Sequence, residues 1–331
     1  MTFRDREKQR LVPLKPLIIQ TDPSVLGTYK GNKYDFAITN PDENLYDGIR
    51  AGALSYFKQR AIQWHDGHDG HPSTHLCCSQ SSCVNSFCPF ASAPKELGEV
   101  LRRLGYAVEE MLPMDADAQG GGAPPYVSFE WIGLENYLNE TSFGEVVPAY
   151  RRARGKGFTS ADFAFRFRRE DGKIQVVLGE WKYTEEYAYD QNIQVAESGT
   201  DRLSIYGPFI WLADSPVHLS PMRAQVLFYE PFYQLMRLQL LASAMEKARE
   251  MDADEVTVLH VAPRANSELV DRITSPGIVH LGGTVHDVWA RIVEKPKFKG
   301  IYAEDLLAHM LLNAPDSGWA QYMHTRYYPM R

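Results

Sequence analysis

A period-2 alternation of hydrophobic and polar residues marks a pair of β-strands near the middle of the chain. In residues 162–168 three phenylalanines alternate with charged or small residues, as in a strand with two unlike faces. Asp171 and Gly172 follow, and this dipeptide is the strongest short signal for a hairpin turn. The second segment, residues 173–183, opens with a largely apolar run, which is typical of a central, buried strand. The pattern therefore predicts a β-hairpin at the centre of a sheet.

Helical periodicity, with apolar residues at steps of three and four, predicts helices on both sides of this hairpin. The predicted helices cover residues 45–64, 95–106, 226–253, 285–293 and 302–312. Residues 255–262 form an apolar run of strand length and predict one more buried strand. Residues 126–140 fit either a helix or a strand that runs into a helix. Strands and helices in this order predict an α/β protein.

A polar segment rich in glycine and proline, residues 113–125, predicts a domain boundary. We place an N-terminal arm and a helical cap before it, in residues 1–125, and a core after it, in residues 126–331. The chain of 331 residues is 44% hydrophobic and 12% aromatic, which is enough for a large core. It has no apolar run of membrane-spanning length, and its charged first residues do not fit a signal peptide. We expect a soluble, cytoplasmic protein without a membrane partner, and nothing in the sequence indicates an oligomeric state.

Glu180 and Lys182 stand two residues apart on the second strand, so both side chains share one face and Trp181 lies on the other. Asp162 begins the neighbouring strand and can come close to Glu180. Two carboxylates at this separation suit a hard cation such as Mg²⁺ (or Mn²⁺), which takes one or two protein carboxylates beside a substrate phosphate. The ion would lower the pKa of a bound water, and Lys182 would orient or deprotonate that water or stabilise the transition state. The alternative is a structural ion pair on an exposed strand.

The segment Ser-Ala-Asp162, the hairpin, and Glu180-Trp-Lys182 together resemble the PD-(D/E)xK signature of the restriction-endonuclease-like nucleases. The match departs at Ala161, where the signature usually has a proline that is often missing in the superfamily. From about Asn44 onward the chain also resembles an uncharacterised group of proteins described as restriction endonucleases. The resemblance implies a restriction-endonuclease-like α/β core, a central mixed β-sheet flanked by helices, with an α-rich N-terminal cap.

The resemblance also implies an activity, the Mg²⁺-dependent hydrolysis of phosphodiester bonds in nucleic acid, with DNA as the favoured target. Asp162 and Glu180 would then be metal ligands, and the lysine beside them would assist the attacking water. Nucleases of this superfamily often place another carboxylate on the helix before the catalytic strands. The candidates here are Glu130 and Glu135, with Glu140 as a third, and a solvated helix face is the alternative for each of them.

The formal net charge of −7 does not indicate nucleic-acid binding, so a DNA-binding function requires a local basic patch. One such patch, interspersed with glycines, directly precedes the first strand of the hairpin and could grip phosphates. The alternative is a set of ordinary surface arginines. The predicted helix 226–253 could add glutamine or arginine side chains to the cleft, and a glutamine at such a place assists some exonuclease-type relatives. The candidate nucleic-acid contacts are Arg151, Arg152, Arg154 and Lys156, together with Gln234, Arg237 or Gln239.

All four cysteines of the chain, Cys77, Cys78, Cys83 and Cys88, lie close together in sequence. Gathered thiolates suit zinc or an iron–sulfur cluster, and some PD-(D/E)xK nucleases carry such a cluster. The spacing is unlike that of a zinc knuckle or a ferredoxin, so one alternative is that the thiols are small hydrophobes packed in the start of a helix. A second alternative assigns importance to Ser79, Gln80, Asn85 and Phe87, because the resembling group has a Ser-Gln…Asn…Phe segment here.

Two rival functions stay open at this point. A non-catalytic nucleic-acid-binding protein of the same fold would keep the basic patch but would have no need of Asp162, Glu180 and Lys182. A cysteine-ligated zinc or iron–sulfur protein would have a structural or redox role. The acids and the lysine that converge on the hairpin favour the nuclease.

Overall fold

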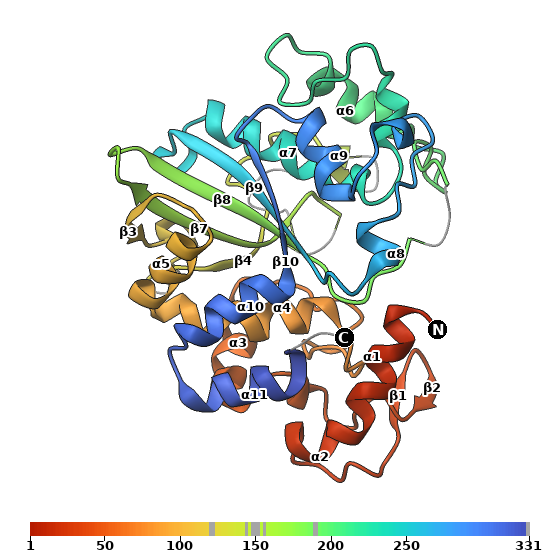
Figure 1. The fold of residues 1–331 in the computed structure, drawn as a ribbon, viewed down its shortest axis with the longest axis vertical. Coiled ribbons are helices and arrows are strands. Elements are labelled where there is room, and N and C mark those ends of the chain that lie inside the picture. Colours follow the sequence, from red (N-terminus) through yellow and green to blue (C-terminus); the bar gives the residue numbers. More distant parts are fainter. Residues whose placement is uncertain (119–122, 143–144, 147–152, 155–156, 188–190, 329–331) are drawn as a thin grey trace.

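A mixed β-sheet, six-stranded in the described part of the chain, runs through the middle of the molecule with helices on both faces (Figure 1). The strand order is β10-β9-β8-β7-β3, and β4 also pairs with β7. The bounds are β3 Val108–Leu112, β4 Ser128–Trp131, β7 Ala161–Arg169, β8 Ile174–Trp181, β9 Glu255–Ala262 and β10 Phe298–Tyr302. The computed structural model describes residues 1–118, 123–142, 145–146, 153–154, 157–187 and 191–328.

The predicted hairpin is confirmed as β7 and β8, which pair antiparallel with Phe163 opposite Gly179. Its turn contains Gly172 at a φ of 81°, a backbone conformation that favours glycine. The strand predicted at 255–262 is β9, which lies parallel to β8, and β10 lies parallel to β9. Since β3 and β4 pair antiparallel with β7, the sheet is mixed, as the resemblance implies.

The alternation in the hairpin separates two hydrophobic clusters, one on each face of the sheet. Phe163, Phe165 and Phe167 belong to the cluster that includes buried residues of α4, α5 and α10. Val176 and Leu178 belong to the other cluster, with residues of α6, α7 and α9. Figure 1 shows these two groups of helices on opposite sides of the strands. The bounds are α4 Ser79–Phe87, α5 Pro94–Arg103, α6 Arg202–Ile210, α7 Phe232–Lys247, α9 Val285–Ile292 and α10 Ala303–Leu312.

Several predicted elements differ from the structure at their ends or in type. The helix predicted at 45–64 is α3, Asp47–Gln59, and the one predicted at 226–253 is α7, which starts directly after Pro231. Pro231 has no N–H, and this suits it to the first turn of a helix but not to its interior. Residues 126–140 contain the strand β4 and turns instead of a helix. The elements β3, α6 and β10 are among those that have no counterpart in the prediction.

The first residues of the chain, predicted as an N-terminal arm, form a segment of short helices and a hairpin. It contains α1 Phe3–Leu11, α2 Lys15–Ile18 and a hairpin of β1 Gly27–Tyr29 with β2 Asn32–Tyr34, and it packs near α11 Ser317–Tyr327 (Figure 1). The carboxylate of the fully buried Glu7 accepts a hydrogen bond of 2.5 Å from the Tyr183 hydroxyl and pairs with Arg10 at 2.6 Å. Because Tyr183 directly follows Lys182, this contact ties the N-terminal segment to the end of the hairpin.

The sheet draws strands from both sides of the predicted domain boundary. Strand β3 comes from residues 1–125 and pairs with β7 of the core. The division at residue 125 therefore stays a prediction from composition. Within the described ranges, the helices are too short or too polar to cross a bilayer.

Gly179 gives the two hairpin strands room for an aromatic stack. A Cβ at this position would lie 2.1 Å from the ring of Phe163, which stacks on Phe87 at a centroid distance of 4.0 Å. We expect Gly179→Ala to lower the free energy of unfolding by about 1–3 kcal/mol, because the crowded ring has no space to move. Urea unfolding measures this, and Gly52→Ala is the control because a Cβ there meets nothing within 4 Å. A Gly179→Ala protein as stable as the control would contradict this account.

Candidate active site

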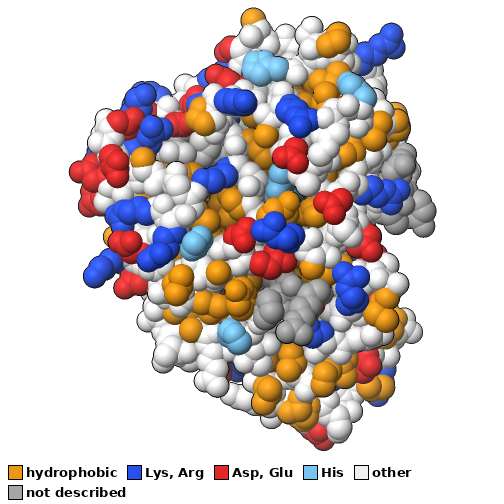
Figure 2. All heavy atoms as spheres, in the orientation of Figure 1, with side chains coloured by type: hydrophobic (Ala, Val, Ile, Leu, Met, Phe, Trp, Pro, Cys, Tyr) orange, Lys and Arg blue, Asp and Glu red, His pale blue; other side chains and the backbone are white. Residues whose placement is uncertain are grey.

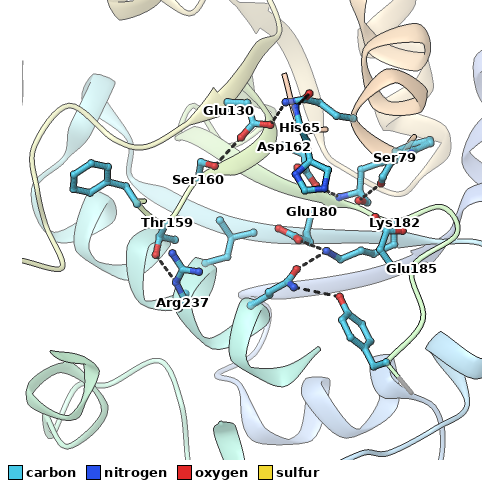
Figure 3. A pocket seen from close by; sticks show the side chains of 16 residues that line it. His65, Ser79, Glu130, Thr159, Ser160, Asp162, Glu180, Lys182, Glu185 and Arg237 are labelled. Atoms are coloured by element: carbon cyan, nitrogen blue, oxygen red, sulfur yellow. Dashed lines mark hydrogen bonds and ion pairs between the residues drawn. The ribbon is translucent and has the colours of Figure 1, made fainter. Parts of the chain in front are cut away.

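A cavity of about 350 Å³ opens where the end of β8 faces the first half of α7 (Figure 3). Its walls come from β4, the segment that leads into β7, the end of β8, α7, and the start of α4. The lining includes Glu130, Asp162, Glu180, Lys182 and Glu185, so one small space holds four acids and a lysine. This concentration of charge distinguishes the cavity from the apolar clusters on either side of the sheet.

The hairpin register brings Asp162, Glu180 and Lys182 together. Since Phe163 pairs with Gly179, Asp162 lies opposite Glu180 on the face toward α7. The Lys182 Nζ is 2.7 Å from Glu180 Oε1, and both side chains are about nine-tenths buried. The backbone N–H of Trp181 donates a hydrogen bond of 2.6 Å to Asp162 Oδ2. A buried arrangement of this kind differs from the exposed, weakly stabilising ion pair that was the alternative.

Lys182 is held as a cation by its surroundings. Burial alone would lower the pKa of Lys182, but the negative charges around it, Glu180 first, raise that pKa well above its usual range. Its ammonium also donates a hydrogen bond to Gln234 Oε1 from α7. Gln234 in turn donates to the Tyr187 hydroxyl at 3.2 Å. The lysine is therefore positioned to donate hydrogen bonds and to neutralise negative charge, and it is a poor proton acceptor.

Glu130 is the third carboxylate of the cavity, and it comes from strand β4, not from a helix. Its backbone has a φ of 50°, an uncommon and strained conformation for glutamate. Gln80 donates a hydrogen bond of 2.7 Å to Oε1, and Ser160 donates one of 2.7 Å to Oε2. Burial raises the pKa of Glu130, and the hydrogen bonds only partly oppose this.

The other two candidate glutamates lie elsewhere. Glu135 is exposed in a turn and does not line the cavity. Glu140 is buried, and it accepts hydrogen bonds from the Thr159 hydroxyl at 2.6 Å and the Tyr206 hydroxyl at 2.8 Å. Of the three, Glu130 is thus the one whose side chain shares the cavity with Asp162.

Helix α7 contributes Gln234 and Arg237 to the cavity wall, whereas Gln239 donates to the backbone carbonyl of Lys297 on another side. Arg237 donates a hydrogen bond of 2.9 Å to Thr159 Oγ1 and lies 3.3 Å from Glu140. Its side chain stays 23% exposed. A partly exposed guanidinium on the rim of an acidic cavity can bind a phosphate group.

Comparison with protein families gives one match across most of the chain. The model of a family described as "Restriction Endonuclease associating with ARP" matches residues 24–328. The chain belongs to this restriction-endonuclease family. Neither the curated proteins nor the solved structures gave a significant match. Membership confirms the resemblance to restriction endonucleases and indicates a nuclease, with nucleic acid as its substrate class.

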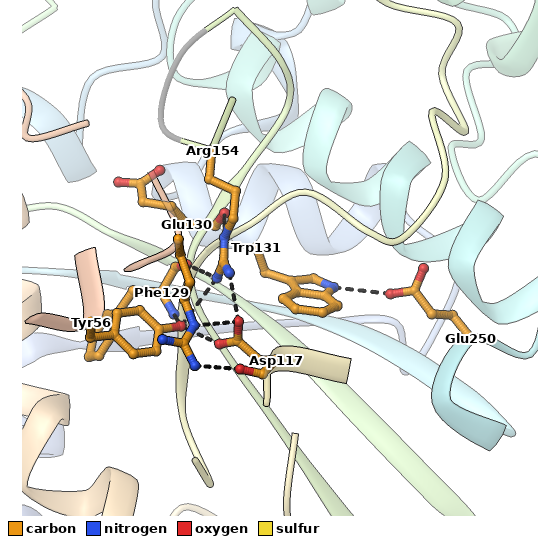
Figure 4. Close-up of polar contacts among 8 residues, drawn as sticks. Tyr56, Asp117, Phe129, Glu130, Trp131, Arg154 and Glu250 are labelled. Atoms are coloured by element: carbon orange, nitrogen blue, oxygen red, sulfur yellow. Dashed lines mark hydrogen bonds and ion pairs between the residues drawn. The ribbon is translucent and has the colours of Figure 1, made fainter. Parts of the chain in front are cut away.

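The basic patch of this family member is only partly described by the structure. Arg151, Arg152 and Lys156 lie outside the described residues. Arg154 is described, and its guanidinium points inward to a buried cluster instead of the cavity (Figure 4). On the face shown in Figure 2, acidic and basic side chains are interspersed without a broad basic surface.

The cluster around Arg154 is centred on the buried Asp117. Asp117 Oδ1 lies 2.7 Å from a guanidinium nitrogen of both Arg60 and Arg154, and Tyr56 donates to Oδ2. Arg154 also donates to the backbone carbonyls of Phe129 and Glu130, the latter at 3.0 Å. These carbonyls flank the strained backbone of Glu130. The position of Arg154 therefore favours a role in holding Glu130 over a phosphate contact.

The four cysteines do not converge on one point. In the part of the chain that the structure describes, no three Cys, His, Asp or Glu side chains form a ready-made metal site. Burial raises the pKa of Cys77 and of Cys88 to about 12, so these thiols stay protonated. This arrangement favours the alternatives to a cysteine-bound metal. Ser79 and Gln80 line the cavity, and Asn85 accepts a hydrogen bond of 2.8 Å from the Tyr46 N–H.

Some lining residues have no signal in the sequence. His65, Ser160 and Glu185 reach the cavity from loops or strand ends, where no periodicity marks a residue as functional. His65 arrives because its backbone N–H donates a hydrogen bond of 2.7 Å to Gln80 Oε1. Ser160 could have been suspected, because it stands two residues before Asp162 in the motif.

The crowding of carboxylates predicts a pH-dependent stability. Burial raises the pKa of Asp162 well above its usual range, and Glu180 and Glu130 raise it further. An acid whose pKa is raised in the folded state does not change the free energy of unfolding below about pH 4, where it is protonated in both states. It lowers that free energy as the pH rises from there through the folded pKa. Without metal, we expect Asp162→Asn to raise Tm by roughly 1–2 °C for each kcal/mol of repulsion removed.

This effect should appear at neutral and alkaline pH and fade below about pH 4, where a protonated Asp162 resembles asparagine. Thermal unfolding in EDTA over a range of pH measures it. Asp171→Asn is the control, because Asp171 is exposed in the turn of the same hairpin and Asn-Gly is an equally good turn sequence. An Asp162→Asn protein that is less stable than wild type at pH 8 would show that the carboxylates do not repel each other.

Proposed function

We propose that the protein is a Mg²⁺-dependent nuclease that hydrolyses phosphodiester bonds in DNA. The observation that carries the proposal is the placement of Asp162 and Glu180, from adjoining antiparallel strands, in one cavity beside Lys182. Family membership supports a nuclease, and the carboxylate-lined cavity supports dependence on a metal ion. Mn²⁺ has similar ligand preferences and would replace Mg²⁺.

The residues of the cavity fit such an ion in chemistry. Asp162 and Glu180 would bind it, with Glu130 as the third carboxylate. Burial and mutual repulsion raise the pKa of Asp162 and of Glu130, so a bound cation would favour their ionised forms. Among the described residues no three His, Cys, Asp or Glu side chains converge as metal ligands, so the ion would keep waters and take further oxygens from the substrate. When bound, Mg²⁺ would lower the pKa of a water and neutralise charge at the phosphate.

The protein's own residues then have separate roles. Lys182, kept cationic by Glu180, donates hydrogen bonds to the attacking water or to a phosphate oxygen and stabilises the charge that develops there. Gln234 holds the ammonium from the side of α7. Arg237, on the rim, binds a neighbouring phosphate and orients the strand.

A cleavage assay tests the proposal. Plasmid and linear DNA should be cut with Mg²⁺ or Mn²⁺ and stay intact in EDTA, with an RNA of matching sequence as the comparison. Asp162→Asn should reduce the rate by about 10²–10³-fold, whereas Asp171→Asn should leave it unchanged. DNA binding without cleavage by the wild type under all metal conditions would favour the non-catalytic alternative. Cleavage that survives EDTA, or that Asp162→Asn does not slow, would refute the proposed metal site.

A further inference from the structure

A second cavity, of about 450 Å³, adjoins the candidate active site on the side of the N-terminal segment. The two cavities share His65, Ser79 and Glu185 in their walls, so they lie directly beside each other. Figure 3 shows these three residues among those that line the acidic cavity. We call this space the N-terminal cavity. Its outer wall consists of Arg4, Lys8, Tyr29, Lys30, Tyr34 and Phe36.

Aromatic rings in this wall contact one another and two lysines. Tyr34 and Phe36 stack at a centroid distance of 4.6 Å, and Lys8 Nζ lies 4.5 Å from the centre of the Phe36 ring. Lys30 lies 5.2 Å from the Tyr29 ring. The rings of Tyr34 and Phe36 are only partly buried. Partly exposed, preassembled rings beside lysines are a pattern by which proteins bind unpaired bases and their phosphates.

The three cations of the wall differ in their partners. Lys30 pairs with Asp66 at 3.1 Å, and Arg4 donates a hydrogen bond of 2.9 Å to the Thr184 carbonyl. Lys8 contacts no acid among the residues that the structure describes. It is therefore the cation of this wall that is best able to bind a phosphate.

We propose that the N-terminal cavity binds an unpaired nucleotide of the substrate strand, with its base on Tyr34 and Phe36 and its phosphate on Lys8. A duplex keeps its bases stacked inside, so only a single-stranded or extruded nucleotide reaches these rings. A cavity of this size is in the range of small-ligand sites. The inference rests on the proposed function in one respect, that the substrate is nucleic acid. It adds that cleavage takes place next to a single-stranded region.

Binding without catalysis tests this inference separately from the nuclease. The probe is a fluorescein-labelled single-stranded DNA of about 12 nucleotides, titrated in EDTA against a Lys182→Ala background, with its duplex and an RNA of the same sequence as further arms. We expect the single strand to bind more tightly than the duplex. Tyr34→Ala and Phe36→Leu should each weaken single-strand binding by about tenfold. Phe36→Leu keeps an apolar side chain and so guards against misfolding.

Matched controls and a spectroscopic readout complete the design. Trp211→Ala removes an aromatic residue that is 65% exposed outside both cavities, and Lys33→Gln removes an exposed lysine from the same hairpin as Tyr34; neither should change binding. Lys8→Gln should weaken binding and flatten its salt dependence. A 2-aminopurine in the probe should change its fluorescence on binding to the parent protein and not on binding to the Tyr34→Ala variant.

Equal affinity of the Tyr34→Ala, Phe36→Leu and parent proteins would overturn the inference, and so would duplex binding as tight as single-strand binding. Loss of affinity in both aromatic variants but in neither control would support it. Tighter binding of the RNA arm would support the site and identify RNA as the strand. Cleavage that Lys182→Ala does not slow would refute the proposed catalytic site, but the binding result would stand by itself.

Discussion

Lys182→Met is expected to slow DNA cleavage by about 10³-fold, the largest effect of any single change considered for this protein. The Lys182 ammonium is 2.7 Å from Glu180, donates to Gln234 and faces the cavity that Asp162 shares. Methionine keeps the apolar stem and fills the same space, so the packing is preserved while the charge is lost. Single-turnover cleavage with saturating enzyme isolates the chemical step from DNA binding.

The control is Lys173→Met, because Lys173 is exposed beside the turn of the same hairpin and does not line the cavity. Its cleavage rate should match that of the wild type. DNA affinity measured in EDTA should change little for Lys182→Met, since one phosphate contact among several is lost. A Lys182→Met enzyme that cleaves within threefold of the wild-type rate would exclude this lysine from the catalytic machinery.

The hairpin and its three polar residues could be predicted from the sequence, because a strand repeats every two residues. That period alone places Glu180 and Lys182 on one face. The turn at Asp171 and Gly172 then sets the register that brings Asp162 opposite Glu180. Local pattern and tertiary structure agree in this hairpin.

The position of Glu130 in the cavity could not be predicted from the sequence pattern. Its side chain enters the cavity because the backbone of β4 takes a φ of 50°, and no periodic pattern encodes a single strained residue. The same holds for Gln80, which reaches Glu130 through the packing of α4 against the sheet. From the sequence, Glu130 was one of three candidate glutamates, and Gln80 was one of several residues in the cysteine-rich segment. Only their long-range contacts identify them as residues of the cavity.

The unpredicted elements have a related explanation. Helix α6 contains Gly207 and Pro208, which both disfavour helices. Its buried Tyr206 and Ile210 pack in the hydrophobic cluster beneath it, and this packing stabilises the helix. Strand β10 is half-buried throughout, so it lacks the contrast between faces that makes a strand visible. In each case tertiary packing overrides a weak local preference.

Arg154 separates two interpretations that the basic patch alone could not distinguish. If Arg154 contacts a phosphate, Arg154→Ala should flatten the salt dependence of DNA binding and leave the fold intact. If Arg154 instead serves as the buried partner of Asp117 and of the carbonyls around Glu130, the same substitution should leave polar groups unsatisfied inside the protein. We expect the second result, a loss of about 3 kcal/mol in the free energy of unfolding.

Cleavage should fall together with stability, because Glu130 loses the clamp that holds its strained backbone. Arg154→Lys retains the charge but cannot grip two carbonyls and a carboxylate at once, so it should recover little of either property. Arg151→Gln and Arg152→Gln, from the same basic patch, provide the comparison for phosphate binding. Urea unfolding, cleavage at a temperature where every variant is folded, and DNA affinity at several salt concentrations measure the three effects. A flattened salt dependence with unchanged stability would return Arg154 to the phosphate-binding patch, and the strained conformation of Glu130 would then need another support.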